Sequence, residues 1–346
     1  MPSVQFWTGQ LGGTAEYRCF GPGRALADRG WDTEYDAEGF DITTGGRVKG
    51  DPDVLVLSRA MGDYLPDAVR RVVACGRTKV VYDIDDWFAG IPAYNPASKV
   101  PAQLIDSMHA AMREADLITC STPELAEAYG HLGETVVLPN YLDRRIWGPY
   151  DGYRSERDFL TLGWHGAFHW RSGDLEILKG WVPDFLRRHP DIRFAAIGCP
   201  ELLEFLGVEG ITVAPMPEDD KTTDLSKNLH PYPHLPVMVS HIDVGLVPLL
   251  PNRFNQAKSW CKGMELNAMG VPAVASESRE YRSFIDPGVN GYLIRRPADW
   301  CRYVERAFDN LDHLREMSRK HADGYWIDDH IDRWVDAYLG GTDGNR

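Results

Sequence analysis

Short apolar runs alternate with longer segments of helical periodicity along the whole chain. Several of the runs are continuously apolar, which is typical of parallel strands buried on both faces. Strand–helix alternation of this kind predicts an α/β fold built from doubly wound sheets. The predicted strands are Val4–Trp7, Asp53–Ser58, Lys79–Asp83, Leu117–Cys120, Thr135–Leu138, Phe159–Trp164, Ile192–Gly198, Ile211–Ala214, Ile242–Val247, Ala273–Ala275 and Tyr292–Ile294.

The series of strands and helices restarts near the middle of the chain, after a polar, aperiodic stretch. We therefore predict two similar α/β domains, at residues 1–145 and 159–327, joined by a linker at residues 146–158. Residues 328–340 form an amphipathic helix that packs back on the first domain, and residues 341–346 are a disordered tail. The predicted helices are Thr14–Arg29, Val100–Ala115, Gly173–His189, Ala298–Asn310 and Asp328–Leu339.

Composition narrows the possible functions. The formal net charge is −14, which argues against broad adhesion to nucleic acid or to anionic membrane. The six cysteines are scattered without a CxxC pair, as expected for buried thiols in a reducing compartment. We find neither a signal peptide nor an apolar run long enough to span a membrane, so we expect a cytoplasmic protein.

The most informative stretch is FNQAKSWCKGMELNAMGVPAVAS, from Phe254 to Ser276. It predicts a helix that ends near Gly270 and is followed by a short apolar strand. In such a helix Lys258, Lys262 and Glu265 share one face. Two cations beside a carboxylate suit a ligand with phosphates and hydroxyls, although a solvated charged face is the simpler alternative.

Polar side chains also follow the first strand of each predicted domain. Gly12 and Gly13 precede a helix that carries Tyr17 and Arg18. Backbone amides at this position suit a phosphate. In the alternative interpretation, the glycines are present only because a tight turn requires their backbone conformation. In the second domain the loop GWHGAFHWRSGD contains glycine, histidine and arginine, residue types that often contact phosphate. Its candidates are Gly166, His169 and Arg171, and Asn255 adds a polar group farther along the chain.

An acidic cluster, Asp83, Asp85 and Asp86, follows the strand Lys79–Asp83. One interpretation is a DxD-type site that holds Mg²⁺ or Mn²⁺ against a diphosphate. Another is a carboxylate that contacts the sugar or activates an acceptor hydroxyl. A purely structural role, as a helix cap or turn former, is the third possibility.

The order of these pieces resembles the GT-B-fold glycosyltransferases, in particular family 4 (glycosyl transferases group 1). The resemblance covers nearly the whole chain and is strongest in DVGLVPL, FNQAKSWCKGMELNAMGVPAVAS and YRSFIDPGVNGYLI. ADLITCSTPELAEAY, VVLPNYLD and GGTAEYR are similar to segments of the family's N-terminal domain. Glu265 matches the second glutamate of the family's E-x7-E motif, but Ala257 replaces the first.

The resemblance implies two Rossmann-like domains facing across a cleft, and a metal-independent, retaining transfer of sugar from a nucleotide-diphosphate donor without a further cofactor. It disfavours the metal interpretation of the aspartates, which belongs to single-domain GT-A enzymes. The acceptor stays open among a glycan, a lipid, a protein, a small molecule and a modified nucleobase. The alternatives are a nucleotide-sugar-binding protein without transferase activity and a GT-B-like epimerase or phosphorylase.

Strand-end position and resemblance together give each candidate residue a predicted role. The predicted catalytic residues are Asp85, His169 and Glu265. The predicted donor-binding residues are Gly12, Gly13, Gly166, Arg171, Asn255, Lys258, Lys262 and Glu265. The predicted acceptor-binding residues are Tyr17, Arg18, Asp83 and Asp86.

Overall fold

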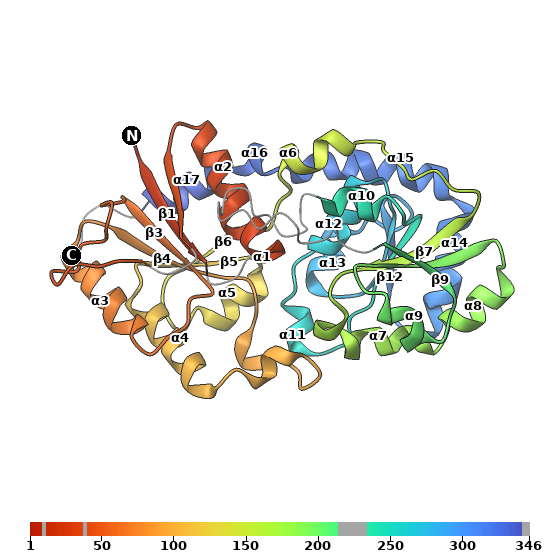
Figure 1. Ribbon diagram of the computed structural model, residues 1–346, viewed down its shortest axis with the longest axis horizontal. Coiled ribbons are helices and arrows are strands. Elements are labelled where there is room, and N and C mark those ends of the chain that lie inside the picture. The colour runs from red at the N-terminus through yellow and green to blue at the C-terminus, as the bar shows by residue number, and fades with distance from the viewer. Residues whose placement is uncertain (9–11, 37–39, 214–233, 341–346) are drawn as a thin grey trace.

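The computed structural model describes residues 1–8, 12–36, 40–213 and 234–340. Within these ranges the chain forms two six-stranded sheets, each covered by helices and lying side by side (Figure 1). All strand pairs within both sheets are parallel. The predicted α/β architecture of two doubly wound sheets is therefore confirmed. Ala214 of one predicted strand and the predicted disordered tail lie outside the described residues.

The N-terminal sheet has the strand order β2-β1-β3-β4-β5-β6. Its strands are β1 (Ser3–Thr8), β2 (Asp32–Asp36), β3 (Val54–Ser58), β4 (Lys79–Ile84), β5 (Leu117–Cys120) and β6 (Thr135–Val137). Alternate residues of β3 enter different cores, with Leu55 and Leu57 on one face and Val54 and Val56 on the other. The period-2 geometry of a strand thus explains why continuously apolar runs are buried on both faces.

Helices cover both faces of this sheet. They are α1 (Gly13–Ala15), α2 (Gly21–Asp28), α3 (Leu65–Cys75), α4 (Ala102–Glu114) and α5 (Pro123–Tyr129). The predicted helix Thr14–Arg29 is present, but its middle, Glu16–Phe20, is π-helical. π-Helical segments are rare and often mark functional sites. Among the described residues no helix has the length and apolar character needed to cross a membrane.

The C-terminal sheet has the order β12-β11-β10-β7-β8-β9, the arrangement of dinucleotide-binding folds. Its strands are β7 (Leu160–His165), β8 (Ile192–Ile197), β9 (Gly210–Val213), β10 (Val244–Val247), β11 (Ala273–Ser276) and β12 (Gly291–Ile294). Its helices are α7 (Ser172–Lys179), α8 (Val182–Arg188), α9 (Glu201–Leu206), α10 (Leu235–Val239), α11 (Arg253–Gln256), α12 (Cys261–Ala268), α13 (Arg279–Phe284), α14 (Trp300–Asp309) and α15 (Leu311–Ala322).

The chain crosses between the two sheets twice. The short helix α6 (Arg144–Trp147) lies on the first crossing, and α16 (Ile327–His330) and α17 (Asp332–Leu339) follow the second. Trp334 and Tyr338 of α17 join the core that contains Val4 and Phe6 of β1. The last helices therefore pack on the N-terminal sheet, far in sequence from their own domain (Figure 1).

Candidate active site

A cleft of about 1220 Å³ lies between the two sheets. Residues from the carboxyl ends of β1, β3 and β4 line one wall, and residues that follow β7 and β10 line the other. In both sheets the strand order reverses at these positions, between β1 and β3 and between β7 and β10. Open α/β sheets bind ligands at such switch points. The topology therefore brings two ligand-binding edges to one cavity.

The predicted continuous helix from Phe254 to Gly270 is broken, so its two lysines do not share one helical face. α11 ends at Gln256 and α12 begins at Cys261. In the break, the Ala257 carbonyl accepts a hydrogen bond from Thr122 Oγ1 at 3.0 Å, and Ser259 Oγ accepts one from the Asn140 amide at 2.9 Å. The N-terminal domain thus satisfies the Ala257 carbonyl, which a continuing helix would have bonded internally.

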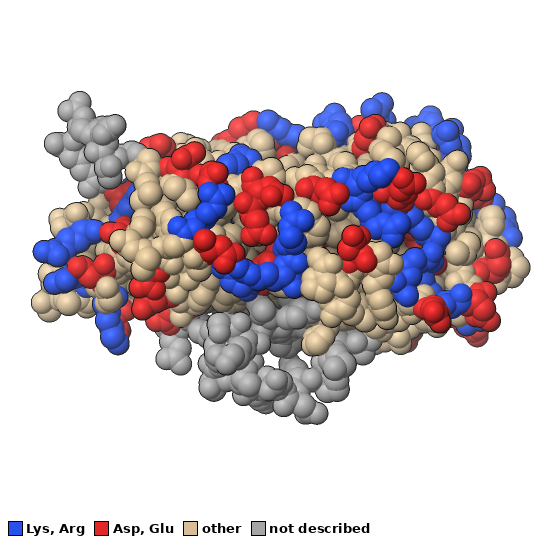
Figure 2. Space-filling model, turned by 90° about the horizontal axis from the view of Figure 1, so that it is seen from above, with Lys and Arg blue, Asp and Glu red and all other residues tan. Residues whose placement is uncertain are grey.

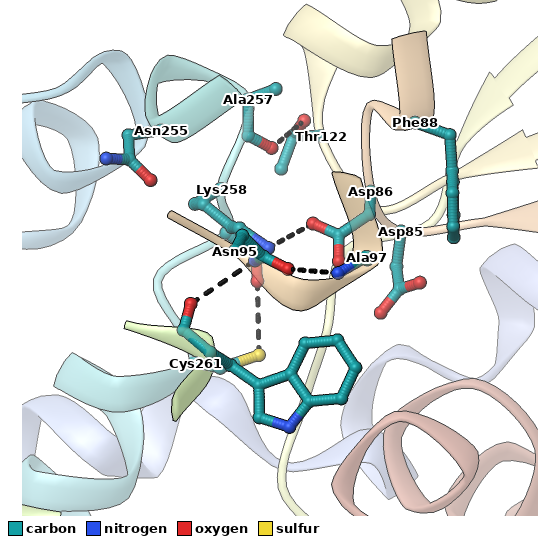
Figure 3. Close-up of polar contacts among 12 residues, drawn as sticks. Asp85, Asp86, Phe88, Asn95, Ala97, Thr122, Asn255, Ala257, Lys258 and Cys261 are labelled. Atoms are coloured by element: carbon teal, nitrogen blue, oxygen red, sulfur yellow. Dashed lines mark hydrogen bonds and ion pairs between the residues drawn. The ribbon is translucent and has the colours of Figure 1, made fainter. Parts of the chain in front are cut away.

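The break places Lys258 and Lys262 at different points of the cleft, which both line. Lys258 pairs with Asp86 of the opposite wall (Figure 3), and Lys262 donates to the carbonyl of His165. Burial lowers the pKa of each lysine to about 8, and the neighbouring Arg171 guanidinium also favours the neutral amines. Arg171 therefore repels both lysines, and an anion bound beside these cations would reduce that repulsion.

Glu265 is held from both sides of the cleft. Tyr17 Oη donates to its Oε1 at 2.5 Å, and His165 Nε2 donates to its Oε2 at 2.8 Å. Burial raises the pKa of Glu265, but the His165 bond, the Lys262 charge and the Tyr17 bond together lower it below its ordinary value. Glu265 is therefore a fixed, charged acceptor that can receive a ligand hydroxyl.

The acidic cluster is organised by Arg59, a residue that the sequence analysis did not single out. Arg59 has a φ of 50°, a left-handed conformation that a non-glycine residue rarely adopts. Its guanidinium pairs with Asp85 and, at 2.8 Å, with Asp86. Charges therefore alternate across the cleft, from Lys258 on the C-terminal wall to Asp86, Arg59 and Asp85 on the N-terminal wall. No group of three or more metal-ligating side chains is found in the part of the chain that the structure describes.

Six predicted site residues lie outside the cleft lining: Gly12 and Gly166, described below, and four residues with side chains. Arg18 and Asp83 form a buried ion pair at 2.6 Å, so they are not placed for the predicted acceptor contact. His169 is largely exposed and faces Glu201 at 3.6 Å, which removes it from the predicted catalytic position. Asn255 is fully buried, with its amide donating to Asp174 at 2.6 Å, and it does not line the predicted donor site.

The predicted glycines have different surroundings. Gly12 has a φ of 123°, which requires glycine, and Gly13 lines the cleft at the start of α1. Gly166 also has a positive φ, of 133°, and a Cβ there would stand 2.8 Å from the Lys262 amine. Glycine at residue 166 therefore leaves the space that Lys262 occupies.

The loop after β4 forms a strap that the sequence analysis missed. Tyr94 Oη donates to Asp174 at 2.9 Å, and the Asn95 amide donates to the Trp170 carbonyl at 3.2 Å. The Tyr94 ring packs so closely on Gly173 that a Cβ would lie 2.3 Å from it. These contacts join the two domains at one edge of the cleft.

Comparison with protein-family models and with curated proteins gave no match. Several solved structures match over almost the full length of both chains. Sucrose-phosphate synthase from Thermosynechococcus elongatus has a TM-score of 0.66 at 12% identity, covering 98% of both chains. A glycosyltransferase from Rickettsia africae has a TM-score of 0.63 at 10% identity, covering 97% of both. Anabaena HepE, solved with UDP, has a TM-score of 0.61 at 13% identity, covering 98% of this chain and 99% of its own.

These likenesses show that the chain shares the two-domain GT-B fold of solved glycosyltransferases, as the sequence resemblance implied.

Proposed function

We propose that the protein transfers a sugar from a nucleotide-diphosphate donor to an acceptor hydroxyl. The observation that carries this proposal is the grouping of Lys258, Lys262 and Arg171 beside Glu265 in the cleft. Cations at this density suit a diphosphate, and a fixed carboxylate suits a ribose or sugar hydroxyl. The GT-B neighbours include HepE, solved with UDP-glucose, which supports a UDP-sugar as the first donor to test.

In the proposed reaction, the bond between the sugar's anomeric carbon and the diphosphate oxygen breaks as the acceptor oxygen attacks. Lys258, Lys262 and Arg171 stabilise the negative charge that develops on the departing diphosphate. Glu265 orients the donor through its hydroxyls, and Asp85 orients the acceptor hydroxyl. In a retaining transfer the acceptor proton passes to the departing phosphate oxygen. Closure of the two domains around both substrates would limit the competing attack by water.

The test is donor turnover with UDP- and GDP-sugars, measured as release of the nucleoside diphosphate with and without EDTA. We expect release from one donor class, with a rate that EDTA leaves unchanged. Complete loss of turnover in EDTA would show that the metal-independent form of the proposal is wrong. Absence of binding by every donor in calorimetry would overturn the proposal altogether.

Binding without transfer is the second candidate function, and Ala257 is the observation that favours it. By resemblance Ala257 stands where relatives carry the first glutamate, and its side chain is buried away from the cleft. Tight donor binding with neither hydrolysis nor transfer, across a broad acceptor panel, would support this candidate. Epimerisation or phosphate-dependent cleavage of the free donor would instead indicate the epimerase or phosphorylase alternative.

A further inference from the structure

The wall of the cleft on the N-terminal side carries a group of apolar side chains beside its charged ones. Trp7, Met61, Phe88 and Ile91 all line the cleft. They also pack in, or against, one hydrophobic cluster of the N-terminal domain. Met61 and Ile91 are half-buried, so part of their apolar surface remains open to the cavity. A ligand with apolar surface would gain free energy by covering these side chains.

Two side-chain amides on the same wall already make hydrogen bonds within the protein. The Asn95 amide donates to the Trp170 carbonyl, and its oxygen accepts from the Ala97 amide at 2.9 Å. Asn140 accepts from Arg18 at 3.0 Å and donates to Ser259. A hydroxyl bound beside these two amides would compete with their existing bonds, and an unpaired buried hydroxyl is costly. The apolar side chains impose no such cost on an apolar ligand.

The apolar wall adjoins the charged groups that would handle the acceptor hydroxyl. The Arg59 guanidinium lies 5.8 Å from the centre of the Phe88 ring, and it pairs with Asp85. Asp85 precedes Phe88 by three residues in the segment that follows β4. Asp85, Phe88 and Ile91 all line the cleft, so a ligand with its hydroxyl at Asp85 meets apolar side chains within the same cavity.

The volume of the cleft exceeds the usual range for a single ligand. Sites for single drug-sized ligands usually measure about 300–1,000 Å³, and this cleft measures about 1220 Å³. We propose that the acceptor is an amphiphile, a hydroxyl-bearing head joined to an apolar chain that lies against Trp7, Met61, Phe88 and Ile91. This inference rests on the proposed transferase function, because that function places an acceptor beside the donor.

The experiment measures how tightly methyl, hexyl and octyl β-glucosides bind to the full-length protein saturated with UDP. Calorimetry is used below the micellar concentration, so that binding does not depend on turnover. Burial of the chain predicts that octyl glucoside binds at least about tenfold more tightly than methyl glucoside. Equal affinities across the series, or tighter binding of methyl glucoside, would overturn the amphiphile proposal.

Variants of the cleft test where the alkyl chain binds. Ile91→Ser and Met61→Ser should each reduce the preference for the octyl chain severalfold while UDP affinity stays unchanged. Ile177→Ser is the matched control, because Ile177 is also half-buried but packs in the C-terminal domain away from the cleft. A preference for octyl that survives both cleft variants would place the chain elsewhere and contradict the proposal.

The two proposals fail in different ways. If UDP and UDP-sugars do not bind at all, the proposed function itself is wrong. If UDP binds and the glucosides show no chain-length preference, the donor site stands and the amphiphile inference alone is overturned.

Discussion

At the scale of single residues, the two cleft lysines carry most of the proposed donor recognition. Lys262→Ala removes a charged amine that lines the cleft and can donate hydrogen bonds to a ligand. Since a charge-assisted hydrogen bond contributes roughly 1.5–3 kcal/mol, we expect UDP affinity to fall about 10- to 100-fold. Calorimetric titration with UDP measures the change. Lys320→Ala is the control, because Lys320 is an exposed residue of α15 that pairs with Glu316; equal losses in both variants would show that the site is misplaced.

The same lysines predict how donor binding depends on pH. Burial lowers the pKa of Lys258 and of Lys262 to about 8, and a bound diphosphate stabilises the protonated amines. Below pH 8 the amines already carry their protons, so affinity changes little. Above pH 8 binding must take up protons, and UDP affinity should fall by up to about tenfold per pH unit for each lysine.

Calorimetry between pH 7.5 and 9.5, in buffers of different ionisation enthalpy, would detect that proton uptake directly. Lys262→Arg should flatten the profile, since a guanidinium stays charged throughout this range. A wild-type affinity that is constant up to pH 9.5 would contradict the assignment of the lysines to the diphosphate.

How far single residues can be predicted depends on whether their role is local. Lys262 and Glu265 were identifiable because charged residues near a strand end in a doubly wound sheet point to a ligand. Arg59 was not, because its role depends on a positive φ and on two aspartates from another strand. His169 was assigned from its place in a glycine-rich loop after a strand and from the family resemblance, but it faces Glu201 outside the cleft lining. Side-chain direction within a short loop is set by tertiary contacts that no local pattern records.

At the scale of elements, the periodicity located nearly all the strands but could not show where helices are interrupted. β2 was missed because its sequence, DTEYD, is polar, as an edge strand can be. The predicted helix Gly173–His189 is two helices, α7 and α8, separated at Gly180 and Trp181. The break between α11 and α12 is made by hydrogen bonds from another domain, so helical periodicity continues through it.

This break leads to a prediction about Ala257. Its side chain is 2% exposed and packs in the core of the N-terminal domain. Ala257→Glu, which would recreate the family's first glutamate, therefore buries a carboxylate without a partner and should destabilise the protein by about 2–4 kcal/mol. Urea denaturation measures the loss. The neighbouring Gln256→Glu, at a half-buried position, should cost far less; a stable, donor-binding Ala257→Glu protein would show that the side chain reaches the cleft.

At the scale of the whole molecule, contacts on several sides fix the positions of the two domains relative to each other. Tyr17 meets Glu265 inside the cleft, and Tyr94 meets Asp174 at its edge. On the face shown in Figure 2, acidic and basic side chains are interspersed, although the net charge is −14. Exposed pairs such as Arg29–Asp332 join the last helix to α2. Such pairs contribute little individually, so buried packing must fix the domain arrangement.

The last helix provides a test of that packing. Trp334 of α17 is 1% exposed, belongs to the N-terminal core and lies edge-on to Tyr141, with ring centres 6.1 Å apart. Trp334→Ala leaves a large cavity in this core and should cost about 3–5 kcal/mol of unfolding free energy. Leu339→Ala on the same helix is the control, because Leu339 is 45% exposed and should change stability by less than about 1 kcal/mol.

Urea denaturation followed by tryptophan fluorescence and by circular dichroism separates the possible outcomes. If α17 is integral to the N-terminal domain, Trp334→Ala lowers the unfolding midpoint, and added UDP recovers part of the loss, because the donor binds the closed pair of domains. Equal midpoints for the two variants would mean that α17 is an appendage. The N-terminal wall of the cleft would then be stable without the last helix, which would contradict the packing described for Trp334.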